Sequence, residues 1–226
     1  MSHTPLVRNF SINYTGISIP FSVGYEELID FYKNLEPQTK NYYCDVVKPG
    51  WNIIDTGANI GMFTLLFSKL TKGRVWAIEA SEQNFNMLCE NVSKTDFATD
   101  NVTLLRNYVS NHSGVDTGEI HFLWTGRGSV LRENGQFNFT TLDDLIGLEQ
   151  PVHLIKIDID GYDFEAIQGA TKILERYKPL VVIELVTEAL QLHGYSPQNV
   201  LDFMAQHNYR NTGILDNCNY IFEFNN

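Results

Sequence analysis

From residue 51 onward, short apolar runs alternate with longer segments in which apolar residues recur every three or four positions. The runs WNIID, RVWAIEA, NVTLLRN, VHLIKID and LVVIEL are typical of buried strands. Helical spacing follows the first run, because apolar residues of NIGMFTLLFSKL stand at 60, 63, 66, 67 and 70. We therefore predict that strands and helices alternate over most of the chain.

The remaining segments complete this pattern. Ser81 is expected to cap a helix, and Thr141 a short helix in TTLDDLI. Residues 114–141 are irregular and contain a predicted antiparallel ribbon, EIHFLW with QFNFT. One helix is predicted over DFEAIQGATKILERY, ended by Pro179, and another over SPQNVLDFMAQH. Two strands, YRNTGIL and YIFEF, end the chain.

The first 49 residues differ, since aromatic residues are spread through polar sequence. We predict a helical lead-in or lid over 1–49 and a Rossmann-like core over 50–226, together a single domain. Its aromatic residues would either close over a substrate or pack into the core; they include Phe10, Tyr14, Phe21 and Tyr25.

Alternation of strands and helices indicates an α/β fold, with a mostly parallel sheet covered on both faces. Such sheets bind ligands where the carboxyl ends of their strands meet. The site is therefore sought at the residues that follow each strand.

Composition narrows the range of partners. Sixteen Lys and Arg against 27 Asp and Glu give a formal net charge of −11, and the basic residues are scattered. Nucleic acid and anionic membranes are therefore not expected as partners. We find no bilayer-length apolar stretch and no secretory signal, and Cys44, Cys89 and Cys218 form no C-x-x-C pair. These features predict a cytoplasmic protein with structural thiols.

The stretch IDTGANIG joins the first core strand to its helix and places Asp55, Gly57 and Gly61 in the spacing D-x-G-x-x-x-G. Glycines permit a tight turn and a close approach by a ligand or neighbouring strand, and free N–H groups at a helix start bind anions. Glu79 ends the next strand, where a carboxylate can accept hydrogen bonds from ribose hydroxyls. This combination favours S-adenosylmethionine over the alternative, a glycine-rich turn that binds nothing.

Four stretches carry a family resemblance: IDTGANIGMFTLLFSK, VWAIEASEQNFNMLCENV, TTLDDLI and HLIKIDIDGYDFEAIQGATKIL. In order and spacing they resemble the FkbM-type S-adenosylmethionine-dependent methyltransferases, over about residues 51–185. The resemblance implies a class I methyltransferase fold, a seven-stranded sheet whose last strand is antiparallel. It also implies O-methylation of a sugar or natural-product hydroxyl.

The resemblance implies roles by position. The implied cofactor residues are Asp55, Gly57, Ala58, Asn59 and Gly61 in the loop, Glu79 with Ala80 and Ser81 at the ribose, and Asn107 and Tyr108 near the adenine. The motif Lys156, Asp158, Asp160, Asp163 would be the family's most distinctive one. This chain departs from the usual Asp-Val-Glu-Gly-Ala-Glu, because it has two shorter acids and Tyr162.

Three interpretations of the carboxylates stay open. In the first, Asp158 or Asp160 is a general base oriented by Lys156, with Glu184 approaching the same cleft. In the second, Asp158, Asp160 and Glu184 hold a divalent metal. In the third, Asp160 and Asp163 cap the next helix and Lys156 satisfies them.

Other polar residues are weaker candidates. His153 is expected to be a satisfied core residue, whereas His193 would either face the cleft or be structural. Arg127, in the stretch Gly126–Ser129, would bind an anionic group of the substrate or be solvated.

The sequence thus predicts an S-adenosylmethionine-dependent O-methyltransferase of small molecules. The alternatives are a cofactor-binding interaction module that has lost catalysis, and a methyltransferase of protein or nucleic acid.

Overall fold

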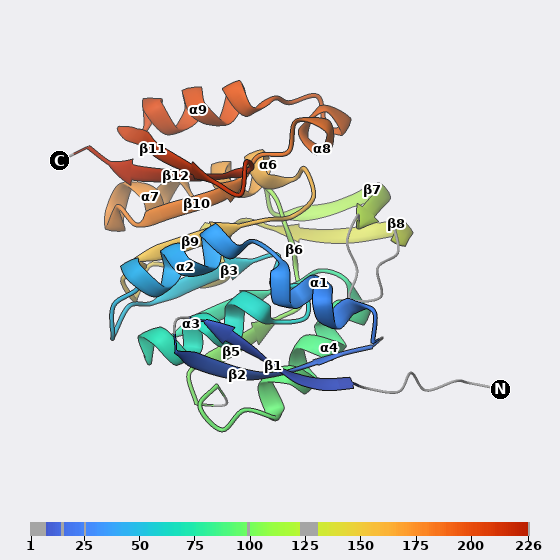
Figure 1. Ribbon diagram of the computed structural model, residues 1–226. Coiled ribbons are helices and arrows are strands. Elements are labelled where there is room, and N and C mark those ends of the chain that lie inside the picture. Colours follow the sequence, from blue (N-terminus) through green and yellow to red (C-terminus); the bar gives the residue numbers. More distant parts are fainter. Residues whose placement is uncertain (1–7, 15, 25, 99, 123–130, 226) are drawn as a thin grey trace.

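The computed structural model describes all residues except 1–7, 15, 25, 99, 123–130 and 226. Its centre is a seven-stranded sheet in the spatial order β11-β12-β10-β9-β3-β4-β5 (Figure 1). The strands are β11 (Tyr209–Leu215), β12 (Asn219–Phe224), β10 (Leu180–Glu184), β9 (Leu154–Ile157), β3 (Ile53–Thr56), β4 (Val75–Ile78) and β5 (Val102–Leu105). Five of them form consecutive parallel pairs, and β12 runs antiparallel to both neighbours. The predicted sheet with an antiparallel last strand is confirmed.

Helices cover both faces of this sheet, as the buried strands require. One face carries α2 (Pro37–Val46), α3 (Met62–Thr71) and α4 (Glu82–Ser93). The other carries α5 (Leu142–Ile146), α6 (Asp163–Gln168), α7 (Thr171–Tyr177) and α9 (Pro197–Gln206). Two short helices, α1 (Leu28–Asn34) and α8 (Thr187–Leu192), complete the set in the described part of the chain. None of these helices has the length and apolar character needed to cross a bilayer.

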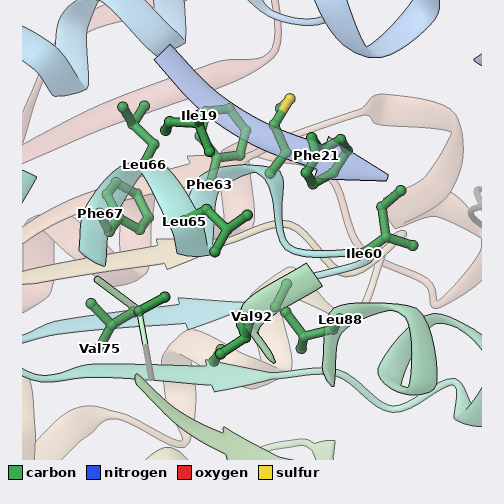
Figure 2. Close-up of a cluster of buried hydrophobic side chains, with 14 of the residues drawn as sticks. Ile19, Phe21, Ile60, Phe63, Leu65, Leu66, Phe67, Val75, Leu88 and Val92 are labelled. Atoms are coloured by element: carbon green, nitrogen blue, oxygen red, sulfur yellow. The ribbon is translucent and has the colours of Figure 1, made fainter. Parts of the chain in front are cut away.

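Alternate strand positions separate the two cores. Ile53 of β3 and Leu154 of β9 face α3, whereas Ile54 and Ile155 face the opposite layer. Figure 2 shows the α3 side, where aromatic and aliphatic side chains of α3 pack between the sheet and Ile19 and Phe21. Because residue parity fixes the face, charged residues at the strand ends are sorted onto faces in the same way.

Residues 8–23 were expected to be helical, and this prediction is wrong. They form an antiparallel hairpin of β1 (Arg8–Tyr14) and β2 (Ile17–Val23), with Ile12, Ile19 and Phe21 buried in the α3-side core. The helical lead-in is correct only for α1 and α2. Phe10 also packs against this core, so the core interpretation holds for Phe10 and Phe21; Tyr25 lies outside the described residues.

A second small sheet stands beside the carboxyl ends of β4 and β5. It joins β6 (Tyr108–Val109), β8 (Leu131–Thr140) and β7 (Gly114–Phe122). The antiparallel pairing of β7 with β8 confirms a ribbon in this region, but both strands are longer than predicted and Glu119–Phe122 pairs with Leu131–Asn134 instead of QFNFT.

Two helix predictions need correction. The helix expected over 163–177 is two helices, because the Gly169 carbonyl turns aside to accept the Asp143 N–H at 2.9 Å. The helix α8 was not predicted. Both predicted helix caps are confirmed. Ser81 Oγ accepts a hydrogen bond from Asn84 N at 3.5 Å, and Thr141 Oγ1 accepts one from Asp144 N at 3.0 Å.

Candidate functional site

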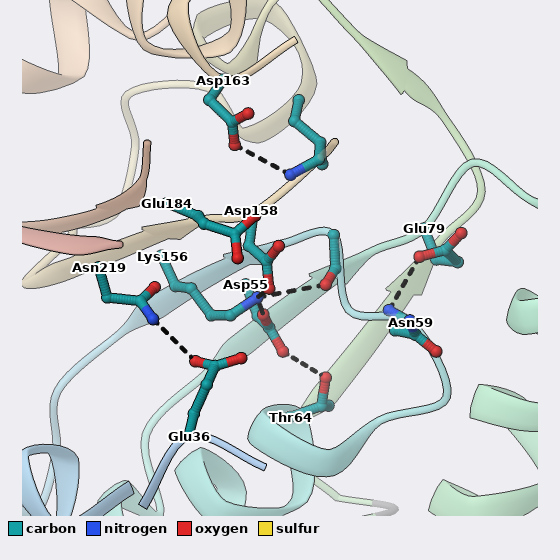
Figure 3. Close-up of polar contacts among 12 residues, drawn as sticks. Glu36, Asp55, Asn59, Thr64, Glu79, Lys156, Asp158, Asp163, Glu184 and Asn219 are labelled. Carbon is teal, nitrogen blue, oxygen red and sulfur yellow. Dashed lines mark hydrogen bonds and ion pairs between the residues drawn. The ribbon is translucent and has the colours of Figure 1, made fainter. Parts of the chain in front are cut away.

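Sheet register brings the charged strand ends together. Asp55 of β3 pairs directly with Lys156 of β9, and Val182 of β10 pairs with Lys156 on the other side. Asp158 and Glu184 each follow two residues later, on the same face. Figure 3 shows Asp55, Asp158 and Glu184 gathered around Lys156 at this edge.

Lys156 is the centre of the cluster. Its Nζ lies 3.1 Å from Asp158 Oδ2, 3.4 Å from Asp55 Oδ1 and 3.2 Å from the Gly57 carbonyl oxygen, to which it donates. Burial alone would lower its pKa, but the negative charges of Asp158, Asp55 and Glu36 raise it above its ordinary value. Lys156 therefore stays protonated and fixes the carboxylates around it.

Asp55 lies behind the cavity wall. It is fully buried, and its Oδ2 accepts a hydrogen bond from Thr64 Oγ1 at 2.6 Å while Oδ1 faces Lys156. The structure thus places Asp55 where it orients Lys156 and the start of α3. Asp55 does not line the cavity, so other residues in the wall would contact a ligand there.

Gly57 is required by two features of the turn. Its φ of +78° lies in the left-handed region, and a Cβ there would stand 1.7 Å from the Asp158 carbonyl oxygen. The end of β3 therefore packs directly on the end of β9. Gly61 has φ +100°, and its missing Cβ faces Leu88 of α4, so this glycine serves helix packing.

The N–H groups of this loop are all used within the protein. Gly57 and Ala58 donate to the Ile78 carbonyl, Asn59 to Glu79, and Gly61 to Ala58. The Ile60 N–H donates to the Asn59 side chain. The N–H groups of residues 57–61 are therefore not free for a ligand, and the one that meets a carboxylate, that of Asn59, meets Glu79 of the protein itself.

Glu79 is held by backbone donors on both oxygens. Oε2 accepts from Asn59 N at 2.8 Å and Oε1 from Ser81 N at 2.9 Å. Burial raises the pKa of Glu79 to about 7, against the lowering effect of these hydrogen bonds. The carboxylate lines the cavity together with Ala80, whereas Ser81 is buried and serves as the helix cap.

Asn107 and Tyr108 also line the cavity. Tyr108 donates from its hydroxyl to Glu133 Oε2 at 2.9 Å, and its ring packs edge-on against Phe137 at 5.0 Å. The small sheet therefore fixes the position of this ring in the wall.

The turn after β9 separates Asp160 from Lys156 and Asp158 of the predicted motif. Strand β9 ends at Ile157, so the parity predicted from the sequence continues only as far as Asp158, which pairs with Lys156. Asp160 follows in the left-handed region, at φ +55°, and still lines the cavity.

Asp163 is buried and closes this turn, because its oxygens accept from Ile159 N and Gly161 N, each at 2.9 Å. Burial raises its pKa to about 7. Asp163 is therefore structural, but the idea that Lys156 satisfies Asp160 and Asp163 is wrong, since Lys156 pairs with Asp55 and Asp158.

Glu184 and Glu36 complete an acidic wall. Cys218 donates from Sγ to Glu184 Oε1 at 3.7 Å, and Asn219 Nδ2 donates to Glu36 Oε2 at 3.1 Å. Burial and the nearby Asp158 raise the pKa of Glu184 to about 10 and that of Glu36 to about 7. At neutral pH Glu184 therefore holds a proton in the ligand-free cavity.

These residues surround a cavity of about 310 Å³, within the range of small-molecule sites. The cofactor-loop and motif residues in its wall are Gly57, Asn59, Glu79, Ala80, Asn107, Tyr108, Asp158, Asp160 and Glu184. Thr56 Oγ1 lies buried in the same wall without a hydrogen-bond partner among the described residues. An unpaired buried hydroxyl is costly unless a ligand or water satisfies it, so the cavity fits a polar ligand.

Sequence reasoning expected a lead-in or lid over residues 1–49 but identified none of the residues in it that line the cavity. Leu28, Phe31, Tyr32, Leu35 and Glu36 close one side of the cavity. The Tyr32 hydroxyl also donates to Asn59 Oδ1 at 3.3 Å. A signal did exist, because the aromatic lead-in was considered as a lid, but nothing local singled out Glu36.

The two histidine candidates, His153 and His193, do not line the cavity. His153 Nδ1 accepts from Asn52 N at 2.9 Å, which confirms a satisfied histidine just before β9. The His193 ring packs on Tyr162 at 4.0 Å, and Arg127 with the stretch 126–129 lies outside the described residues. Within the described ranges no cluster of three or more His, Cys, Asp or Glu is arranged to hold a metal ion.

Comparisons with known proteins agree with this architecture. The sequence model of the Methyltransferase FkbM domain matches residues 55–211. The hexuronic acid methyltransferase AglP of Haloferax volcanii is 26% identical over 156 residues, which are 67% of this chain and 60% of that protein.

Two solved structures share the fold. The FkbM methyltransferase of Methylobacillus flagellatus KT superposes with a TM-score of 0.54 and 20% identity, over 81% of this chain and 50% of that one. A SAM-dependent methyltransferase of Aquifex aeolicus gives 0.51 and 16%, over 84% and 89%. The chain thus spans less than two thirds of the Haloferax and Methylobacillus proteins.

Proposed function

The chain belongs to the FkbM methyltransferase family, and from this premise we propose that it is an S-adenosylmethionine-dependent O-methyltransferase of a sugar or a related small-molecule hydroxyl. The family predicted from the sequence motifs is confirmed. The cofactor, the acceptor and the residue roles below are our proposal.

The cavity wall fits the parts of S-adenosylmethionine. Glu79 would accept hydrogen bonds from the ribose, while Tyr108 and Asn107 would border the adenine. Gly57 and Asn59 would face the amino acid end, and Thr56 Oγ1 offers an unused polar atom beside them. When bound, this cofactor supplies a methyl group on a positively charged sulfur.

Asp158 is our candidate for the general base. An alcohol is a poor nucleophile at neutral pH, so removal of its proton is worth about 10²–10⁴-fold in rate. In the proposed step the hydroxyl oxygen bonds to the methyl carbon, the carbon–sulfur bond breaks, and the hydroxyl proton passes to Asp158. Lys156 acts as a positioning residue, because it holds Asp158 at 3.1 Å and does not itself line the cavity.

The other acids have different roles. Burial and the nearby Asp158 raise the pKa of Glu184 to about 10 in the ligand-free cavity, so Glu184 is not our candidate for the base. Asp160 lines the same wall without an ion pair to Lys156, which leaves it the second candidate.

One observation carries the proposal: Lys156 orients the carboxylate of Asp158 in a ligand-sized cavity, and the backbone of Asp158 packs directly on Gly57 in the turn after β3. A carbohydrate acceptor is supported by the similarity to a hexuronic acid methyltransferase. A small acceptor is supported by the volume of the cavity.

Calorimetric titration of S-adenosylhomocysteine into the wild type and Glu79→Gln tests the cofactor. We expect saturable binding by the wild type and a loss of about tenfold or more in the variant, as for a hydrogen bond to a charged group. Glu175→Gln, an exposed acid on α7, is the matched control. No binding by the wild type would refute the proposal.

A screen of sugars and natural-product alcohols with methyl-labelled cofactor then tests the reaction. Label in an ether-linked methyl group supports O-methylation. Cofactor binding without transfer to any acceptor would instead favour a binding module that has lost catalysis.

A further inference from the structure

The charged side chains that line the cavity are all acidic within the described part of the chain. They are Glu36, Glu79, Asp158, Asp160 and Glu184. Lys156 lies close by, but its side chain is only 3% exposed and its charge is shared between Asp55 and Asp158. Among the described residues, the cavity wall therefore carries an excess of acidic side chains.

The proposed cofactor does not balance this excess. With a sulfonium, an ammonium and a carboxylate, S-adenosylmethionine carries one net positive charge. Glu79 is already stabilised by two backbone N–H groups and Asp158 by Lys156. Of the described groups, only the neutral side chains of Asn219 and Cys218 donate hydrogen bonds to Glu36 and Glu184, so at least one further positive group can be accommodated between them.

Glu36 is held in place from two sides. Its backbone lies in the left-handed region at φ +46°, directly before Pro37 of α2, and Asn219 Nδ2 donates to its carboxylate. Asp216 Oδ2 accepts from both Thr39 N and Thr39 Oγ1 at 2.8 Å, which anchors the start of α2. These anchors lie outside the residues matched by the family model, 55–211. They hold the Glu36 carboxylate in the cavity wall.

Glu184 stands opposite, across Lys156 (Figure 3). The negative groups that raise its pKa after burial are Asp158, Asp163, Glu36 and Asp160. After burial, the negative charges of Asp158 and Asp216 raise the pKa of Glu36, whereas the positive charge of Lys156 lowers it. Burial is the main cause of the raised pKa values of Glu36 and Glu184, and repulsion by the neighbouring acids adds to it. A cation between the two carboxyl groups would favour their ionised forms and release protons.

We propose that Glu36 and Glu184 bind a protonated amine of the acceptor, and that the acceptor is an amino sugar or an aminated glycoside. Thr56 Oγ1, buried in the same wall with no hydrogen-bond partner in the described part of the chain, also indicates that this cavity holds a polar ligand. A protonated amine has no free electron pair, so it serves recognition while a neighbouring hydroxyl receives the methyl group. This inference rests on the proposed function.

The test uses hexoses that share one ring and differ in charge. Glucosamine, galactosamine, glucose and glucuronate are titrated calorimetrically into the protein saturated with S-adenosylhomocysteine, in two buffers of different ionisation enthalpy at pH 7.5. We expect an amino sugar to bind about tenfold tighter than glucose, with proton release, and glucuronate to bind weakest. Glu36→Gln and Glu184→Gln should each lose most of this preference, whereas Glu175→Gln keeps it.

Equal affinities, a preference for glucuronate, or binding without proton release would overturn the inference. So would the absence of amino-sugar binding by protein that still binds S-adenosylhomocysteine, and the proposed function would then stand. Failure to bind S-adenosylhomocysteine would refute both. Retained cofactor affinity in the two variants excludes misfolding as the reason for a lost preference.

Discussion

At the end of β4, the Glu79 carboxylate is held by the backbone N–H groups of Asn59 and Ser81. At the ends of β9 and β10, by contrast, Asp158 and Glu184 are held by side chains, Lys156 and Cys218. Backbone donors come with the fold, whereas side-chain partners can change without changing it. We infer that the Glu79 side of the cavity binds the cofactor, which is the same in every methyl transfer by this family. The opposite side, formed by Asp158 and Glu184 and called the acidic side below, would bind the acceptor, which differs from one enzyme to another.

The largest expected effect comes from removing the base on the acidic side. Asp158→Asn should lower kcat by about 10²–10⁴-fold while the Kd for S-adenosylhomocysteine stays within about twofold. The measurement is steady-state kinetics with the acceptor found in the labelled screen. Asp160→Asn, in the same wall, should lose far less activity, and asparagine suits its left-handed backbone. A larger loss in Asp160→Asn would transfer the role of base to Asp160.

The second effect concerns stability. Lys156→Met leaves the fully buried Asp55 without its cation and should lower the free energy of unfolding by about 3–5 kcal/mol. Urea denaturation measures this, with the exposed Lys172→Met as a control expected within about 0.5 kcal/mol of wild type. Addition of Asp55→Asn should recover part of the loss. An unaffected Lys156→Met would mean that Asp55 is stabilised by Thr64 alone.

The Glu79 side was easier to predict from sequence than the acidic side. The strands, the Gly57 turn and Glu79 follow from local patterns, because apolar runs and glycines fix a strand–turn–helix unit. Lys156 and Asp158 were found for the same reason. The pairing of Lys156 with Asp55 depends on the register of two strands about a hundred residues apart, which no local pattern contains.

The residues that the sequence did not reveal are held by hydrogen bonds between the N-terminal and C-terminal parts of the chain. Glu36 meets Asn219 across 183 positions, and Thr39 meets Asp216 across 177. The hairpin of β1 and β2 did have a local signal, alternating apolar residues around Gly16, which the helical interpretation overlooked. The break at Gly169 had only the glycine itself as a local signal, and its contact with Asp143 could not be read from the sequence.

The third prediction uses the raised pKa values. Burial raises the pKa of Glu79, Asp163 and Glu36 from 3.8–4.5 to about 7, and that of Glu184 to about 10. The folded state then binds more protons than the unfolded state, so stability falls as pH rises through this window. We expect the free energy of unfolding of the ligand-free protein to be lower at pH 8.5 than at pH 5.5 by about 2 kcal/mol or more.

Glu184→Gln separates the two sides in this experiment. The variant should lose the part of the pH dependence above pH 7 and be more stable than wild type at pH 8.5 by at least about 1 kcal/mol. Glu175→Gln should follow the wild type. A stability that rises from pH 5.5 to 8.5 would show that the acidic side is not strained by its charges.

The smallest effect tests whether the anchor outside the family-matched region serves only the acidic side. Asp216→Asn weakens the hydrogen bonds from Thr39 and Gln38 to a charged acceptor at the start of α2, and should cost about 1 kcal/mol of stability. Because Glu36 begins this helix, the KM for the acceptor should rise a few-fold, while Kd for S-adenosylhomocysteine stays unchanged. Asp202→Asn, exposed on α9, is the control. If cofactor affinity fell as much as acceptor affinity, the anchor would position the whole N-terminal wall, including the Tyr32 contact with Asn59. The N-terminal wall would then support both sides of the cavity. Glu184 alone would remain as a residue that distinguishes the acceptor side from the cofactor side.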